Sequence, residues 1–225
     1  MELSKPTLYI FISLYALEIT LGVVGNVTTL IVLLFGKKCK NEIRLFLINL
    51  AVADLFMVIL CLPFTLQNTI TVEFTLPAFF CSAILFTQML SVALSVFTNV
   101  SIGVERLLAV KYPFLHLRFT RCRRGLTLLA IWILSIAFSG TQLQISYVLT
   151  QNGTVYCDEK FPNLTADHVY AVCLLFILCI LPSTSLMVLY GVISRHLWFR
   201  ELPGAADDVR DKLQIKNSRK VLLCL

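Results

Sequence analysis

The pair Glu105-Arg106 stands directly after a run of residues, Cys81 to Val104, that contains no Lys, Arg, Asp, Glu or His. This run of 24 residues exceeds the roughly 20 that a helix needs to cross a bilayer. The chemistry that the pair offers is ion pairing. An acid and a base at the edge of a span are costly to bury, so they mark a functional site by default. The alternative is a helix-end arginine that only extends its charged head toward water.

Other polar side chains lie inside the apolar runs. Asp54 stands about ten residues into its run, near mid-membrane, so its carboxylate must face the interior of a helix bundle and find partners there. Asn26 and Ser95 reach a similar depth if the runs are antiparallel neighbours. Two interpretations stay open for Asp54. It could help to form a small hydrated pocket of oxygen ligands for a cation such as sodium, or it could be a neutral, hydrogen-bonded residue that joins helices.

A second polar set consists of Asn49, Thr98 and Trp132. An indole N–H in apolar surroundings needs an acceptor, and an asparagine side chain can supply one. We expect this set to join spans structurally. Glu18 is an isolated acid in the outer half of the first run, and the sequence assigns it no role.

The elements that must position these residues follow from composition. The 225 residues are 58% hydrophobic and 14% charged, whereas a soluble domain carries about 25% charged residues. The apolar residues come in continuous blocks, so they predict membrane-spanning helices and not barrel strands. We therefore expect an all-α membrane protein, a transmembrane helix bundle of five spans that forms a single domain over residues 1–225. The expected spans are Leu8–Phe35, Leu45–Thr69, Phe79–Leu108, Gly125–Tyr147 and Val169–Leu197.

A sixth apolar segment begins at Val221 and reaches Leu225. Its length of about 7.5 Å as a helix is too short to cross a bilayer. The first run lacks the cleavage signature of a secretory leader, so we expect the first span to direct its own insertion.

The distribution of positive charge predicts the orientation. Of the 19 Lys and Arg residues, only Lys5 and Lys160 lie in the segment before the first span or in the loops after the second and fourth. The positive-inside rule places these segments outside the cell and the other loops in the cytosol. We thus expect an extracellular N-terminus at 1–7, an extracellular loop at 149–168 and a cytoplasmic loop at 198–220. Since the basic residues are divided among short loops, we expect no nucleic-acid partner.

The predicted extracellular loop carries several further signals. Of the eight cysteines, only Cys81 and Cys157 fall on the oxidising outer side. A bridge between them would be worth about 4–5 kcal/mol in the chain-entropy model. Asn152 and Asn163 begin glycosylation sequons. Asn152-Gly153 is also a preferred hairpin-turn pair, so we expect a short hairpin of 145–148 with 154–157 over the mouth of the bundle.

Two prolines interrupt the expected spans. Pro182 lies in the middle of the fifth span, eight residues before Tyr190, and Pro63 lies near the outer end of the second. Each removes one backbone donor, so we expect a kink at each position. Such kinks would open a cavity toward the outside.

Taken together, these residues resemble the rhodopsin-like G-protein-coupled receptors, with matches in order along essentially the whole chain. Cys81 stands 25 residues before Arg106, as the disulfide cysteine of that family does. Leu107 departs from the tyrosine of the family's Asp/Glu-Arg-Tyr triplet. The matching markers are Gly25-Asn26, Leu50-Ala51-Val52-Ala53-Asp54, Glu105-Arg106-Leu107, Pro113-Phe114, Trp132, Pro182 and Tyr190.

The resemblance implies roles for these residues. Asp54 and Ser95 look like the family's pocket for an allosteric sodium ion, which tends to stabilise the inactive state; no other cofactor is expected. Arg106 would be held by Glu105 at rest and released toward a heterotrimeric G protein on activation. The remaining G-protein-coupling roles fall on Pro113, Phe114 and Tyr190, and Asn26, Asn49, Thr98, Trp132 and Pro182 would be structural.

The resemblance also narrows the ligand. Amine receptors of the family keep an Asp at the position of Gln88, so its absence argues against a biogenic amine. The chain looks more like the receptors for peptides, such as those for neuropeptide Y, and a lipid or other small acid is the second choice. Gln67, Gln88 and Gln142 are the expected ligand contacts, and for each of them a solvated or helix-bridging amide is the alternative. Gln142 stands where the family usually has a proline.

Two interpretations of the whole chain remain open at this stage. It is either a fragment of a complete receptor, whose function it shares, or a truncated, non-signalling form that acts by retention in the endoplasmic reticulum or by pairing with a full-length receptor. We expect the complete receptor to lie in the plasma membrane, in contact with lipid. An enzyme is not expected, because the sequence contains neither a metal-ligand cluster nor a nucleophile-base pair.

Overall fold

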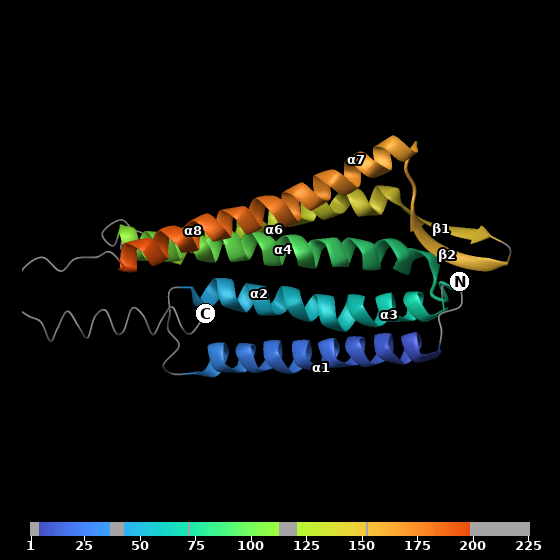
Figure 1. Ribbon diagram of the computed structural model, residues 1–225, viewed down its shortest axis with the longest axis horizontal. Coiled ribbons are helices and arrows are strands. Elements are labelled where there is room, and N and C mark those ends of the chain that lie inside the picture. Colours follow the sequence, from blue (N-terminus) through green and yellow to red (C-terminus); the bar gives the residue numbers. More distant parts are fainter. Residues whose placement is uncertain (1–4, 37–42, 72, 113–120, 152, 199–225) are drawn as a thin grey trace, which may run out of the picture.

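A computed structural model describes residues 5–36, 43–71, 73–112, 121–151 and 153–198 (Figure 1). Within these residues, five helical segments are long and apolar enough to cross a membrane. Their bounds are Pro6–Phe35, Arg44–Thr71, Ala78–Lys111, Cys122–Ile145 and Leu164–His196. The five predicted spans are therefore confirmed. The predicted sixth segment, 221–225, lies outside the described residues.

Three of the spans are single helices: α1 (Lys5–Phe35), α4 (Ala78–Lys111) and α6 (Arg121–Ile145). The other two contain a π-helical segment each. The second span consists of α2 (Arg44–Phe56), η1 (Met57–Cys61) and α3 (Leu62–Thr71), and the fifth consists of α7 (Leu164–Leu175), η2 (Phe176–Ile180) and α8 (Leu181–Trp198).

A π-helical segment precedes each of the two intramembrane prolines. In both spans the π segment is followed by Leu-Pro, at Leu62-Pro63 and Leu181-Pro182. The amides of Leu62 and Leu181 donate to the carbonyls of Met57 and Phe176, five residues earlier. Proline clashes with the carbonyl four residues before it, and a wider turn gives that carbonyl room.

The helix α4 is the centre of the bundle. It packs against α2 and η1 on one side and against α6 and α8 on the other. Figure 1 shows α1 on the outer side of α2 and α3, away from α7 and α8. A cluster of buried apolar side chains from α2, α4 and α6 forms the core; its members are Phe46, Ala53, Leu90, Leu94, Ile102 and Ile131.

The outer helices present apolar side chains away from the bundle. On α1, Ile31 and Leu34 are 53% and 50% exposed, and on α7 Val172 is 64% exposed. Contiguous apolar surface of this extent is not stable in water. Exposed apolar faces of this kind are typical of a multi-pass membrane protein.

A two-stranded hairpin follows the fourth span. Strand β1 (Ser146–Gln151) pairs antiparallel with β2 (Thr154–Glu159), with Gln151 opposite Thr154 next to the turn. Gly153 has φ of 82°, a conformation that glycine adopts without steric cost. The predicted hairpin is confirmed, and it ends the fourth span at Ile145 instead of the expected Tyr147. Figure 1 places it at the same end of the bundle as the start of α1. This end, which the charge distribution predicts to be extracellular, is called the outer end below, and the opposite end is called the cytosolic end.

Candidate functional site

A hydrogen-bonded triad joins three helices in the cytosolic half of the bundle. Asn49 of α2 donates through Nδ2 to Thr98 Oγ1 of α4 at 2.8 Å. Its Oδ1 accepts from Trp132 Nε1 of α6, also at 2.8 Å. Asn49 is 9% and Thr98 0% exposed. One asparagine therefore satisfies both an indole donor and a hydroxyl, and the predicted structural set is brought together.

At the outer end, two contacts fix the hairpin to α4. The disulfide Cys81–Cys157 joins the first turn of α4 to β2, with the Cα atoms 5.6 Å apart. Beside it, the Ser146 hydroxyl donates to Ser82 Oγ at 2.7 Å. The predicted bridge between the third span and the loop before the fifth is confirmed.

Phe74 links the loop after the second span to the same hairpin. Its amide donates to the carbonyl of Val155 at 2.7 Å, and its side chain is 3% exposed. Its ring meets Phe64 of α3 edge-on, with centroids 5.6 Å apart. The hairpin is thus held by the second and third spans together and forms a fixed cover at the outer end.

The three predicted ligand contacts lie in different surroundings. Gln67 of α3 donates to Thr75 Oγ1 at 2.6 Å, near the hairpin end. Gln88 is half-buried in the outer part of α4. Gln142 is 2% exposed and donates to the Tyr170 hydroxyl of α7 at 3.0 Å. The geometry of Gln142 is that of a helix-bridging amide, and contact of all three with a ligand stays a prediction.

Asp54 and Ser95 are in direct contact at mid-membrane. The Ser95 hydroxyl donates to Asp54 Oδ1 at 2.9 Å. Asn26 lies close by on α1, but its amide donates to its own helix, at Gly22 O, at 2.9 Å. The Asp54–Ser95 contact places a carboxylate and a hydroxyl oxygen together, as either interpretation of Asp54 requires.

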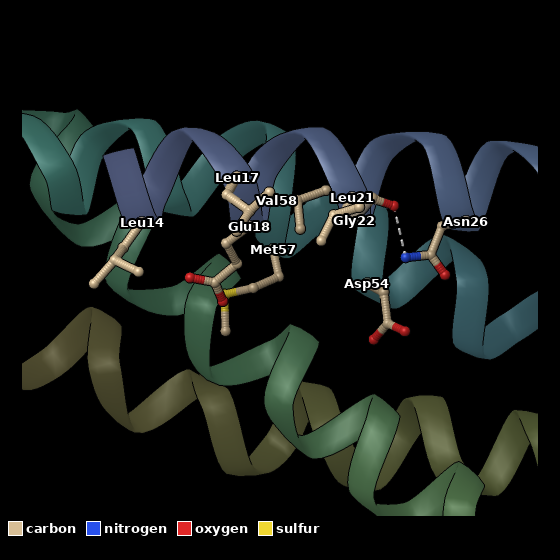
Figure 2. A pocket seen from close by; sticks show the side chains of 9 residues that line it. All are labelled: Leu14, Leu17, Glu18, Leu21, Gly22, Asn26, Asp54, Met57 and Val58. Atoms are coloured by element: carbon tan, nitrogen blue, oxygen red, sulfur yellow. Dashed lines mark hydrogen bonds between the residues drawn. The ribbon is translucent and has the colours of Figure 1, made fainter. Parts of the chain in front are cut away.

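A cleft of about 620 Å³ runs between α1 and the second span. Figure 2 shows Glu18 near Met57 at one part of this cleft and Asp54 near Asn26 at another. Its other lining residues are mostly apolar: Leu14, Leu17, Leu21, Gly22 and Val58. Glu18, which had no assigned role, therefore lines the same cleft as Asp54.

At the cytosolic end, Glu105 faces a different cation from the one that the resemblance implies. Arg124 Nε of α6 lies 3.6 Å from Glu105 Oε1, and the two residues are 9% and 5% exposed. Arg106 is the next residue along α4, and neighbours in sequence do not face each other on a helix. Within the described part of the chain, the ion pair of Glu105 is with Arg124 and not with Arg106.

The helix α8 packs against α4 at Gly103, two residues before Glu105. A Cβ at Gly103 would come within 3.0 Å of Leu189 and 3.2 Å of Leu186, so glycine permits the close approach of α8 to α4. Tyr190 follows Leu189 and is half-buried. The other predicted coupling residues, Pro113 and Phe114, lie outside the described residues.

The two predicted glycosylation sites differ. Asn152 lies outside the described residues. Asn163 is exposed and caps the N-terminus of α7, with its Oδ1 accepting from the Ala166 amide at 2.7 Å. Its modification by a glycan stays a prediction.

Sequence reasoning missed Arg124, Tyr170 and Phe74 as partners within the site. Arg124 is one of the basic residues outside the predicted extracellular segments, and the charge distribution gave it no further role. The absence of any acid in the first turn of α6 was a usable signal, because a helix N-terminus with only positive side chains needs an anion from elsewhere.

Comparison with known proteins supports the resemblance. Residues 25–225 match the model of the family described as 7 transmembrane receptor (rhodopsin family). The chain is 25% identical to the QRFP-like peptide receptor of Branchiostoma floridae over 231 residues. This matched region covers 100% of this chain and 61% of that receptor.

Two further relatives are receptors named after peptides. The gastrin/cholecystokinin type B receptor of Rattus norvegicus is 32% identical over 190 residues, which cover 83% of this chain and 42% of the relative. The galanin receptor type 2 of Homo sapiens is 32% identical over 221 residues, which cover 93% of this chain and 54% of the relative. The chain spans about half the length of these curated relatives. With this family match, the buried triad and the disulfide-anchored hairpin, the chain belongs to the rhodopsin family of seven-transmembrane receptors, which are receptors and not enzymes.

Proposed function

We propose that the complete receptor binds an extracellular peptide beneath the hairpin and activates a heterotrimeric G protein at its cytosolic end. The observation that carries the proposal is the hairpin, held to α4 by Cys81–Cys157 over the outer end of the bundle. The names of the three relatives support a peptide as the ligand. The proposal concerns the complete receptor, because the chain spans about half the length of its relatives.

The ligand end is built from the outer parts of the second, third and fifth spans. Gln67 and Gln88 lie there on α3 and α4, and amides of this kind can hydrogen-bond a peptide backbone. A fixed hairpin reduces the ordering cost of binding, because the cover is in place before the ligand arrives. A peptide, being longer than a lipid headgroup, would contact both the amides and the hairpin.

At the cytosolic end, Arg106 is the residue that would contact the G protein. Phe114 would insert into the G protein, and Tyr190 of α8 would stabilise Arg106 once it turns outward. The closeness of α8 to α4 at Gly103 supports this arrangement, because it brings the helix of Tyr190 beside that of Arg106.

A sodium ion near Asp54 is a further part of the proposal. Hard cations take oxygen ligands, and Asp54 Oδ1 with Ser95 Oγ supplies two of them at 2.9 Å from each other. The donor chemistry therefore fits. When bound, the ion would supply the positive charge that a carboxylate at mid-membrane requires.

We also propose that the complete receptor resides in the plasma membrane with its N-terminus outside. A tag added before Met1 should be detected on cells that have not been permeabilised. Detection only after permeabilisation, with immature glycans, would indicate retention in the endoplasmic reticulum and contradict this location.

The decisive experiment reconstitutes the complete receptor in lipid nanodiscs with purified G proteins of each class. Galanin, gastrin and cholecystokinin serve as first probes, beside a panel of amidated peptides and a panel of acidic lipids. Guanine-nucleotide exchange stimulated by a peptide, and abolished by Arg106→Ala, is the expected result. Exchange stimulated by a lipid alone would refute the peptide assignment, and no exchange with any probe would refute the function.

A further inference from the structure

We infer that Arg124 competes with Arg106 for the carboxylate of Glu105 and so sets how readily Arg106 is available to a G protein; this rests on the function proposed above. Arg124 is a positioning residue, because it acts through Glu105 and not on the G protein. The starting observation is the 3.6 Å contact between Arg124 Nε and Glu105 Oε1.

The burial of the pair shows that the contact is part of the packed structure. Glu105 is 5% and Arg124 9% exposed, so neither charge is largely in contact with solvent. Buried charges require a partner, because desolvation of an isolated ion is costly. Whichever arginine approaches Glu105 gains most of that compensation.

The position of Glu105 favours α6 as the source of its cation. Arg124 lies in the first turn of α6, where the partial positive charge of the helix end favours an anion. Arg123 and Arg124 add full positive charges to the same turn, and no acid of that turn offsets them. The carboxylate of Glu105 therefore meets both a guanidinium and a positive helix end.

Arg106 is poorly placed in the same competition. It follows Glu105 directly on α4, so the two side chains leave the helix about 100° apart. Among the residues that the structure describes, Glu105 forms its 3.6 Å ion pair with Arg124, and Arg106 forms none with it. Holding Arg106 would require Glu105 to turn away from α6. With Arg124 in place, the resting restraint on Arg106 is weak.

Removal of Arg124 should shift Glu105 toward Arg106 and lower the basal activity of the receptor. The experiment measures ligand-free guanine-nucleotide exchange by the complete receptor, normalised to receptor number. Arg124→Gln should lower it about fivefold or more, the scale of typical coupling between sites. Arg124→Lys, which keeps the charge, should restore most of the activity.

Two controls separate competition from a merely structural role. Arg123→Gln removes the same charge from the same turn but from an exposed side chain, so it weakens only the positive helix end and should lower basal exchange much less than Arg124→Gln does. Glu105→Gln should raise basal exchange, and adding Arg124→Gln to it should have no further effect. Equal or higher exchange in Arg124→Gln, or independent effects in the double variant, would overturn the inference.

A second measurement keeps the inference separate from the proposed function. Thermal melting of Glu105→Gln, Arg124→Gln and their combination reads the coupling of the pair without a G protein. The melting-temperature losses should be smaller in the double variant than the sum of the single losses. Additive losses would overturn the inferred interaction between Glu105 and Arg124. Coupled losses in a receptor that never drives exchange would refute the proposed function but support the interaction.

Discussion

Replacement of Asn49 by alanine tests the structural triad most directly. The change removes the acceptor of the Trp132 indole and the donor to Thr98. One hydrogen bond between membrane helices contributes about 0.6 kcal/mol on average and about 1.7 kcal/mol at most, so losing two costs about 1.2–3.4 kcal/mol. Thr98 can turn its hydroxyl to a carbonyl of its own helix, whereas the indole N–H has no such choice. The lower half of this range is therefore expected.

The assay is reversible unfolding in mixed micelles of mild detergent and dodecyl sulfate, followed by circular dichroism. Fluorescence is unsuitable because the chain has only two tryptophans and one of them belongs to the triad. Asn99→Ala is the matched control, since Asn99 is exposed on α4 next to Thr98. It should change the free energy of unfolding by less than about 0.5 kcal/mol, as surface substitutions usually do.

A double-mutant cycle isolates the Asn49–Trp132 bond from the loss of indole packing. Trp132→Phe keeps the six-membered ring and removes the N–H. The combined variant with Asn49→Ala should be less destabilised than the sum of the two single variants, by about 0.6–1.7 kcal/mol. Additive losses would refute the reasoning, because they would show that the 2.8 Å contact carries no energy.

Three further predictions concern the outer loop and the packing of α8. Replacing both Cys81 and Cys157 by serine should lower stability by up to about 4.5 kcal/mol in the chain-entropy model, measured by melting; unchanged melting with and without reductant would contradict it. Thr165→Ala should remove the glycan at Asn163 on gel mobility and leave melting unchanged, whereas Asn163→Ala should also lose the cap of α7, worth about 0.5–2 kcal/mol; equal melting of the two variants would contradict the cap. Gly103→Leu should destabilise the bundle by about 1–3 kcal/mol by overpacking against Leu186 and Leu189, whereas Gly191→Leu, where nothing lies within 4 Å, should not; equal melting losses would contradict close packing.

Much of this arrangement could be predicted from the sequence because a membrane limits the possible solutions. A span must be helical and apolar, so length and charge alone located all five. An indole at mid-span needs an acceptor, and this requirement predicted the contact between Asn49 and Trp132. The turn pair Asn152-Gly153 placed the hairpin to within a few residues.

The contacts that sequence reasoning missed depend on which faces of the helices meet. Spacing along one helix gives the direction of a side chain but not the neighbour that it meets. The resemblance implied that Glu105 holds Arg106, its neighbour in sequence, yet neighbours in sequence point in different directions on a helix. Arg124 becomes the partner only because α6 crosses α4 with its first turn at that height. Tyr170 likewise meets Gln142 only through the approach of α7 to α6.

The polar contacts of the bundle are arranged in layers along α4, and this explains how its helices hold their register. Cys81 and Glu105 are separated by about 36 Å of helix, close to the thickness of a bilayer core plus its edges. Ser95 and Thr98 lie between them and contact Asp54 and Asn49 of α2. Apolar contacts in lipid permit sliding of one helix along another, because the tails are as apolar as the side chains. Each directional contact fixes the height of a neighbouring element along α4. The contacts of α4 therefore set the register of α2 at mid-depth, of the hairpin at the outer end, and of the first turn of α6 at the cytosolic end.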